Sequence, residues 1–387
     1  MTSALLNPAL DASRAARFDP PPTEPREFHD RLPDAAPTPL REAVMLRDRL
    51  NLGAVLVKDE SWRFGLPAFK ALGASWAVYR LLEQARGRPF EYWTSLGALR
   101  AQIAALGPRT LITATDGNHG RGVARVARWF GFEAIVYMPR DTAASRVRAI
   151  ESEGATVDVI EGDYDEAVRR ASAIASELDD AWLVQDTAFD GYREIPAWIV
   201  DGYSTMFHEI DDELRARNEA PPDLVIVQVG VGSLAMAALR HFKSRERDGA
   251  APVVLSVEPG PLGCALESIR RGEATSTPDP QSIMAGMNCG TLSIDAWPLL
   301  RDGLDGCLSI DDDRAREGMR HLAQDGVVSG ETGAAGAGAL FALVESDEAA
   351  PLREAFAIGP ETRALILSTE GATDPESYRA IVGAVPR

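Results

Sequence analysis

The sequence predicts an α/β protein with two doubly wound domains and mostly parallel sheets. Short continuous apolar runs, typical of strands buried on both faces, alternate with longer segments whose apolar residues recur at helical spacing. The chain has 387 residues, 45% of them hydrophobic, which is enough for one large or two medium cores. The strand and helix segments are too many for one sheet of usual size, so we expect two domains.

The first part of the chain is expected to be an arm followed by a helix, a strand and a second helix. Residues 1–40 are rich in proline and alanine, which favours an extended arm lying on the body over a separate domain. A helix is expected over 41–50 and a strand over 54–57. Apolar residues then recur at helical spacing over 72–85, which predicts a helix that starts near Lys70.

After a connector over 87–108, strand and helix signals alternate to the end of the chain. Strands are expected over 110–113, 134–138, 156–160, 182–185, 224–229, 253–257 and 364–367. Helices are expected over 119–130, 145–153, 165–178, 195–217, 312–324 and 334–344, and from residue 233 onwards. We expect 1–89 and 186–387 to form a large domain and 90–185 to form a small one.

Charge and hydropathy argue against several classes of protein. The formal net charge is −18 and the pI is near 4.8, and binding to nucleic-acid phosphates requires clustered cations instead. No apolar run approaches membrane-spanning length. The N-terminus has no basic leader, and Asn7 and Pro8 interrupt its apolar run, so we expect no signal peptide and a cytoplasmic location.

No metal site is expected. Cys264, Cys289 and Cys307 lack the spacing of metal ligands, and the five histidines are scattered without a zinc-binding motif. Each cysteine is readily interpreted as a small buried apolar residue.

The first stretch with chemical potential is 57–70, which crosses a polar loop and delivers Lys70 to the start of a helix. The positive end of a helix dipole and the apolar surface of Phe69 both lower the pKa of an amine, which is what an imine-forming lysine needs. The alternative is an ordinary solvated lysine near a helix end.

The second stretch, 113–120, runs from a strand into the start of a helix. Backbone N–H groups at such a turn form a cradle for a carboxylate or a phosphate. Asp116 would repel an anion there unless it acts as a base. The alternative is that Asp116 caps the helix.

The third stretch, 228–234, joins an apolar strand to a helix through Gly230, Val231, Gly232 and Ser233. Free N–H groups, glycines that allow close approach and a serine hydroxyl suit a phosphate, although a plain turn is also compatible with this pattern. It is neither a Walker A motif nor a dinucleotide fingerprint. A phosphate loop without a nucleotide signature, a candidate imine lysine and an anion cradle together suggest pyridoxal 5′-phosphate.

The chain resembles the fold type II (tryptophan synthase β-like) superfamily of pyridoxal-phosphate enzymes, and within it looks most like the diaminopropionate ammonia-lyases. The resemblance extends from about residue 38 to about residue 378. Its motifs lie at 58–61, 64–73, 115–124, 185–187, 191–192, 195–196, 230–232 and 368–371. The stretch 115–124 is the most specific, because relatives that act on serine or threonine carry a serine where Asp116 stands.

The resemblance implies a set of cofactor contacts. Lys70 would hold the cofactor as an internal aldimine beside Phe69, and Asn118 would hydrogen-bond its phenolic oxygen. Ser368 matches the position whose hydroxyl meets the pyridine nitrogen, a contact that favours elimination over transamination. Glu331 is expected near the ring, with a capping role as the alternative. The phosphate would be bound by Gly230, Val231, Gly232, Ser233 and Leu234, and these contacts would lie in a large, cofactor-binding domain.

The resemblance also implies a substrate site and a reaction. The backbone from Thr115 through Gly117 and Asn118 to His119 would bind the substrate carboxylate. Asp116 would be the base for the α-proton, and Asp186 a second carboxylate that serves the opposite face or the departing amine. Two such acids would let the enzyme accept both enantiomers, with pKa values tuned toward the working pH. The alternative for Asp186 is an ordinary strand-end aspartate.

The implied activity is α,β-elimination of 2,3-diaminopropionate to pyruvate and ammonia through an external aldimine and aminoacrylate, in a homodimer. The alternatives are a serine/threonine dehydratase-like or other β-elimination or β-replacement enzyme, and a catalytically silent pyridoxal-binding protein. Cys264 and Cys289 fall in the region where the family has its substrate entrance; free thiols are favoured there over a disulfide bond in a reducing cytoplasm.

Overall fold

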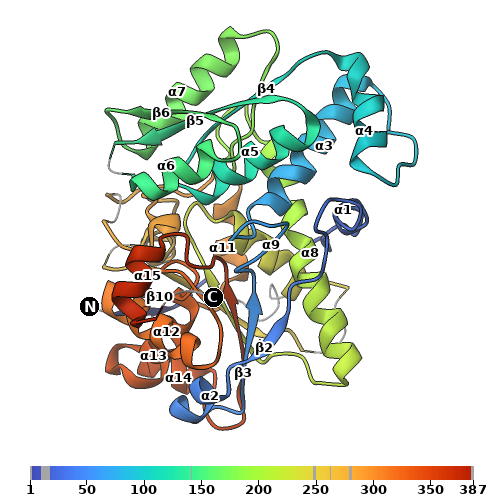
Figure 1. The fold of residues 1–387 in the computed structure, drawn as a ribbon. Helices are drawn as coiled ribbons and strands as arrows, with labels where there is room; N and C mark the ends of the chain where they lie inside the picture. The colour runs from blue at the N-terminus through green and yellow to red at the C-terminus, as the bar shows by residue number, and fades with distance from the viewer. Residues whose placement is uncertain are drawn as a thin grey trace. The chain divides into compact units, whose positions relative to one another are not determined.

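A computed structural model describes residues 2–9, 18–140, 142–246, 250–261, 263–278 and 281–384. Its strands form one seven-stranded sheet and one four-stranded sheet, with helices connecting successive strands (Figure 1). Most strand pairs in both sheets are parallel, which confirms the predicted fold class. The long helix expected over 195–217 and the helix expected over 312–324 are present almost residue for residue.

The chain forms two compact units. The first unit comprises 1–21, 37–62 and 206–387, and the second comprises 22–36 and 63–205. The domains expected from the sequence have other boundaries, since they assign 22–36, 63–89 and 186–205 to the large domain. That division stays a prediction.

The first unit contains the seven-stranded sheet. Its five inner strands run parallel, and its two edge strands are antiparallel to their neighbours. In spatial order the strands are β1 (Ser3–Leu6), β10 (Gly306–Ile310), β9 (Val253–Pro259), β8 (Leu224–Gln228), β11 (Arg363–Ser368), β3 (Ala54–Asp59) and β2 (Leu40–Glu42).

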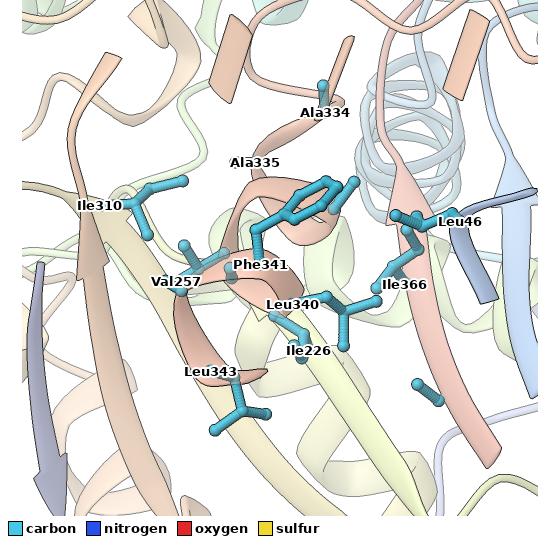
Figure 2. Close-up of a cluster of buried hydrophobic side chains, with 14 of the residues drawn as sticks. Leu46, Ile226, Val257, Ile310, Ala334, Ala335, Leu340, Phe341, Leu343 and Ile366 are labelled. Carbon is cyan, nitrogen blue, oxygen red and sulfur yellow. The ribbon is translucent and has the colours of Figure 1, made fainter. Parts of the chain in front are cut away.

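The core of this unit lies between the sheet and α13 (Ala335–Glu345). Figure 2 shows Leu340 and Phe341 of α13 among isoleucine side chains of β8, β10 and β11, all of them buried. A Cβ atom on Gly338 would lie 2.7 Å from the Arg314 backbone oxygen of α12 (Asp312–Gln324), so only glycine allows the two helices to approach this closely. Gly336 and Gly338 of α13 therefore serve packing.

The other helices of the first unit are shorter. They are α2 (Val44–Leu50), α9 (Ser233–Phe242), α10 (Cys264–Arg271), α11 (Ala296–Gly303), α14 (Ala350–Ala355) and α15 (Pro375–Val382), with the 3₁₀ turns η2 (Ala285–Met287) and η3 (Asp347–Ala349). The long helix α8 (Glu194–Arg217) contributes residues to both units.

The second unit contains the four-stranded, all-parallel sheet, in the order β6-β5-β4-β7. Its core includes Ile112, Ala114 and Leu183 from the sheet and Ala167 and Ala171 from one covering helix. Its strands are β4 (Thr110–Ala114), β5 (Glu133–Pro139), β6 (Thr156–Ile160) and β7 (Ala181–Leu183). Its helices are α1 (Glu24–His29), α3 (Ala71–Arg86), α4 (Leu96–Ile103), α5 (Asn118–Phe130), α6 (Ala144–Glu151) and α7 (Tyr164–Glu177), with the 3₁₀ turn η1 (Ala104–Leu106).

Two segments have more regular structure than expected. The N-terminal arm forms the edge strand β1, which pairs with β10, and it also contains α1, whose Phe28 is buried. The connector over 87–108 contains α4, which buries only Leu99 and Ile103. Two buried positions on one helix give too weak an apolar pattern to be recognised in a sequence.

Candidate active site

Lys70 immediately precedes α3, so the loop-to-helix junction expected for it is present. Its Nζ donates a hydrogen bond to Asp186 Oδ2 at 2.6 Å, and its side chain is 22% exposed. The chain has three lysines. Lys58 and Lys243 are buried, and their amines are held at 2.7 Å by Glu209 and Asp305 respectively. Lys70 is therefore the lysine that a carbonyl compound can reach.

The expectation that the pKa of Lys70 is lowered is wrong for this structure. Burial does lower the pKa of the amine, but the Asp186 carboxylate more than compensates, and the net pKa is raised above its ordinary value. The aromatic rings of Phe69 and Tyr203, whose centroids lie 5.7 and 5.9 Å from Nζ, also favour the charged amine. Lys70 is an ammonium whose proton has a carboxylate acceptor beside it.

Asp116 lies in the turn between β4 and α5, two residues before the helix begins. Burial raises the pKa of its carboxyl to about 6, while the charges of Arg146 and Lys70 oppose a larger rise. Arg146 Nη1 also donates to the Asp116 backbone oxygen at 3.2 Å. A carboxyl with this pKa is mostly ionised at neutral pH and can still exchange a proton readily, as a general base must.

The turn around Asp116 is closely packed. The Thr115 hydroxyl accepts a hydrogen bond from the Gly117 N–H at 3.0 Å, and a Cβ atom on Gly120 would lie 2.3 Å from Thr115 Cγ2. At the start of α5 the Arg121 N–H donates to the Gly117 backbone oxygen at 3.0 Å. Asn118 and His119 thus occupy the first turn of α5, where backbone N–H groups face an anion.

His119 joins this cluster through its ring. Its Nε2 donates to the Val184 backbone oxygen at 2.8 Å, and its Nδ1 lies 3.8 Å from Asp186 Oδ2. Burial lowers the pKa of the imidazole, so the ring is neutral and its proton is on Nε2. Nδ1 has no hydrogen-bond partner within the described part of the chain.

Asp186 follows β7 and is buried between Lys70 and His119. Burial raises the pKa of its carboxyl, but the positive charge of Lys70 dominates and brings it to about 2. The strand end is fixed by Gln185, whose Oε1 accepts the Ala114 N–H at 3.0 Å, and by Tyr192, whose hydroxyl accepts the Gln185 N–H at 2.8 Å. Lys70, Asp116, His119 and Asp186 thus form one cluster at the carboxyl edge of the four-stranded sheet.

Sequence reasoning missed two residues of this cluster. Arg146 lies on α6 and no motif marks it, because only the fold brings it to Asp116. Tyr203 of α8 lies beside Lys70, and its ring centroid is 4.8 Å from that of Phe69. The adjacent Gly202 is the only local sign that this helix packs closely on a neighbour.

The glycine loop of the first unit joins β8 to α9, as expected. Gly232 has φ +100°, a conformation that favours glycine, and a Cβ atom there would lie 2.6 Å from Ala296 Cβ. A Cβ atom on Gly230 would lie 3.1 Å from the Gly286 backbone oxygen and 3.4 Å from Cys289 Sγ. Val231, Ser233 and Leu234 complete the loop and the first turn of α9, and all three are buried.

Ser368 and Glu331 lie near the same edge of the seven-stranded sheet. Ser368 ends β11, the neighbour of β8, and its hydroxyl lies 2.8 Å from that of Ser329. Glu331 accepts a hydrogen bond from the Ser377 hydroxyl, and the next residue, Thr332, donates its N–H to Glu370 at 3.0 Å. The acid is therefore engaged with another segment of its own unit.

This edge of the first unit fits a phosphate ester and an aromatic nitrogen. The glycine loop lies at a helix N-terminus, where backbone N–H groups can bind a phosphate. Two buried polar atoms there, Gln228 Oε1 and Thr369 Oγ1, have no hydrogen-bond partner among the residues that the structure describes. A polar cofactor is a natural partner for such atoms.

The described residues contain neither a cluster suited to a metal ion nor a membrane-spanning helix. Among the described residues, no three or more His, Cys, Asp or Glu side chains are grouped so that they could hold a metal ion. Within the same ranges, no helix combines the length and the apolar character needed to cross a membrane. Cys264, Cys289 and Cys307 form no disulfide bond in this structure.

Comparison with known proteins identifies relatives over nearly the whole chain. The family model of the pyridoxal-phosphate dependent enzymes matches residues 32–356. The chain is 37% identical to the diaminopropionate ammonia-lyase of Salmonella typhimurium (strain LT2), over 92% of this chain and 90% of that protein.

Two solved structures are similar throughout. Diaminopropionate ammonia lyase from Escherichia coli in complex with D-serine superposes with a TM-score of 0.90 at 33% identity, over 99% of this chain and 97% of that one. The same enzyme in complex with an aminoacrylate-PLP azomethine reaction intermediate gives a TM-score of 0.86 at 32% identity, over the same shares of the two chains. The chain therefore belongs to the diaminopropionate ammonia-lyases, a family of pyridoxal-phosphate dependent enzymes with the fold type II architecture.

Proposed function

We propose that this protein converts 2,3-diaminopropionate and one water molecule to pyruvate and two molecules of ammonia. The observation that carries the proposal is the cluster of Lys70, Asp116 and Asp186, in which one reachable lysine lies beside two carboxyls of very different pKa, one buried and one partly buried. Environments that push the pKa values of paired groups apart are typical of acid–base sites. The family membership supplies the substrate class.

We propose that Lys70 and the glycine loop hold the cofactor. Lys70 would bond to its aldehyde, Gly230 to Leu234 would bind its phosphate, and Ser368 would meet its ring nitrogen. When bound, pyridoxal phosphate withdraws electrons from the substrate α-carbon, which makes the α-proton acidic and allows the β-amino group to leave.

Asp116 acts as the base for the α-proton, because its pKa near 6 leaves it ionised at neutral pH. The N–H groups of the turn from Thr115 to His119 orient the substrate by its carboxylate. Arg146 holds the Asp116 backbone and limits the rise in the pKa of its carboxyl.

Asp186 receives the proton that Lys70 must lose before its amine can act as a nucleophile, since Nζ lies 2.6 Å from Oδ2. Once the charge of Lys70 is gone, burial is the dominant influence on Asp186 and raises the pKa of its carboxyl. With this raised pKa, Asp186 can act as a second proton-transfer group, either for the opposite enantiomer or for the departing amine.

The test is product formation from a panel of small amino acids. Both enantiomers of 2,3-diaminopropionate, L-serine and L-threonine are incubated with the holoenzyme, and pyruvate, 2-oxobutyrate and ammonia are measured. We expect two ammonia per pyruvate from diaminopropionate, and a loss of activity in Asp116→Asn and Asp186→Asn. Asp190→Asn, a fully exposed aspartate of the same unit, is the matched control. Efficient deamination of serine or threonine without pyruvate from either diaminopropionate enantiomer would identify a dehydratase instead.

We also propose that the enzyme is a cytoplasmic homodimer, as its family suggests. Light scattering on the purified holoenzyme should give twice the chain mass of 41.7 kDa. A single-chain mass at micromolar concentration would contradict the dimer.

A further inference from the structure

Tyr203 is a buried phenol to which the proposed reaction assigns no part. Its side chain is 0% exposed, and its hydroxyl has no hydrogen-bond partner in the described part of the chain. Burying a hydroxyl without a partner costs free energy, so such a group in a core calls for an explanation. Its ring lies beside Phe69, and Lys70 Nζ is 5.9 Å from the ring centroid.

The packing of α3 against α8 fixes Tyr203 in this place. A Cβ atom on Gly202 of α8 would lie 2.6 Å from the Leu72 backbone oxygen and 2.8 Å from Gly73 Cα. A Cβ atom on Gly73 of α3 would lie 2.6 Å from Tyr203 Cε1. The two helices therefore cross with backbone against backbone at this point. Lys70 precedes α3 by less than one turn, so the crossing holds the phenol against the lysine.

The two polar neighbours of Lys70 differ in what they can offer its amine. Asp186 is ionised and can only accept a hydrogen bond, so it binds the ammonium form. The phenol of Tyr203 is neutral, because burial raises its pKa even though the charge of Lys70 opposes this. A neutral phenol accepts from an ammonium and donates to the lone pair of a neutral amine.

We propose that Tyr203 is a positioning residue for Lys70. The Tyr203 hydroxyl donates a hydrogen bond to the neutral Lys70 amine and so orients the amine toward the incoming carbonyl carbon. Asp186 binds the ammonium form of Lys70. When Lys70 loses a proton, its Nζ instead accepts a hydrogen bond from the Tyr203 phenol. This proposal rests on the proposed function, because it assigns Tyr203 a part in each turnover through Lys70.

The test variant is Tyr203→Phe, which keeps the ring and removes only the hydroxyl. Apoprotein is mixed with pyridoxal 5′-phosphate in a stopped-flow instrument, and the band of the bound cofactor at roughly 410–420 nm is followed from pH 6 to 9. We expect the rate constant for cofactor attachment and kcat to fall about tenfold, the factor that corresponds to one hydrogen bond of about 1.4 kcal/mol. KM should change less than about twofold, because the hydroxyl does not touch the substrate.

A stability measurement separates positioning from packing. Because the hydroxyl is unpaired, the apoprotein of Tyr203→Phe should melt at the same temperature as the wild type or above it. Tyr137→Phe, which removes another buried phenol of the same unit, should leave both rates unchanged. Unchanged rates in Tyr203→Phe, or a lower melting temperature with rates that fall equally in both variants, would overturn the proposal.

The result of the Tyr203→Phe experiment can be distinguished from a failure of the proposed function. Cofactor attachment is measured without any amino acid, so a wild-type protein that attaches the cofactor but releases no pyruvate from diaminopropionate still tests Tyr203. In that case an attachment rate that Tyr203→Phe leaves unaltered overturns the positioning role, and a tenfold slower one supports it.

Discussion

The ionisation of Asp116 should govern how the elimination rate depends on pH. Burial raises the pKa of this carboxyl to about 6, against an ordinary value of 3.8. A general base acts only when ionised, and a group with a pKa of 6 is ionised to about nine-tenths at pH 7 and about one-tenth at pH 5. We therefore expect kcat/KM for diaminopropionate to fall about tenfold from pH 7 to pH 5.

Substitution of Arg146 should shift the pH at which kcat/KM falls on the acid side of the profile, called here the acid limb. Its positive charge opposes the effect of burial on Asp116, and a nearby opposite charge lowers a carboxyl pKa by roughly 1–3. Because Arg146 is only partly buried, solvent screens part of this effect, and we expect Arg146→Met to move the limb about one pH unit higher. Arg148 is exposed on the same helix, so Arg148→Met should leave the limb in place.

The assay is pyruvate release, coupled to NADH oxidation by lactate dehydrogenase, from pH 5 to 8 at constant ionic strength. Asp116→Asn should lower kcat/KM for at least one enantiomer by about 10²–10⁴-fold and abolish the limb near pH 6. An acid limb that persists in Asp116→Asn, or that does not move in Arg146→Met, would refute the assignment of Asp116 as the base.

Three further predictions concern stability. The buried carboxyl of Glu258 has a pKa of about 7 against an ordinary value of 4.5, so its contribution to the free energy of unfolding is complete below pH 4.5 and is lost as the pH rises through 7. The free energy of unfolding in urea should therefore fall by up to about 3 kcal/mol more in the wild type than in Glu258→Gln between pH 4.5 and 8. Parallel plots of this free energy against pH would contradict the raised pKa of Glu258. Gly232→Ala should cost about 1–3 kcal/mol more than Gly272→Ala, because both positions have positive φ and only the first is crowded, and equal thermal shifts would speak against the packing of the glycine loop. Lys58→Met should cost about 3–5 kcal/mol in denaturant unfolding, because it removes the cation paired with the buried Glu209 carboxylate, and a cost below about 1 kcal/mol would show that the ion pair is dispensable.

Much of the fold was predictable because its strands are short, apolar and separated by glycine or proline. β4, β6 and β8 lie within a residue or two of their expected places. Strand ends also led to the site, since the stretches after β4 and β8 each run from an apolar strand into a helix. In each of the two sheets the carboxyl ends of the parallel strands lie at one edge, so the stretches that carry chemistry could be anticipated before their contacts were known.

What the sequence did not reveal depends on partners far along the chain. The pKa of Lys70 is raised rather than lowered because Asp186, 116 positions away, lies at hydrogen-bond distance. Tyr203 reaches Lys70 only because Gly73 and Gly202 allow two helices to cross closely. No local pattern carries either fact. The roles of Asn118, Glu331 and Ser368 toward the cofactor stay predictions.

The most direct test of the central claim is to locate the lysine that bonds to the cofactor. The holoenzyme is treated with borohydride, digested and analysed by mass spectrometry, with only Lys58, Lys70 and Lys243 as candidates. We predict a pyridoxyl group on Lys70 and none on the other two, whose amines are buried in ion pairs. A modified Lys58 or Lys243, or no modified lysine in a protein that shows the absorbance of bound cofactor, would contradict this account.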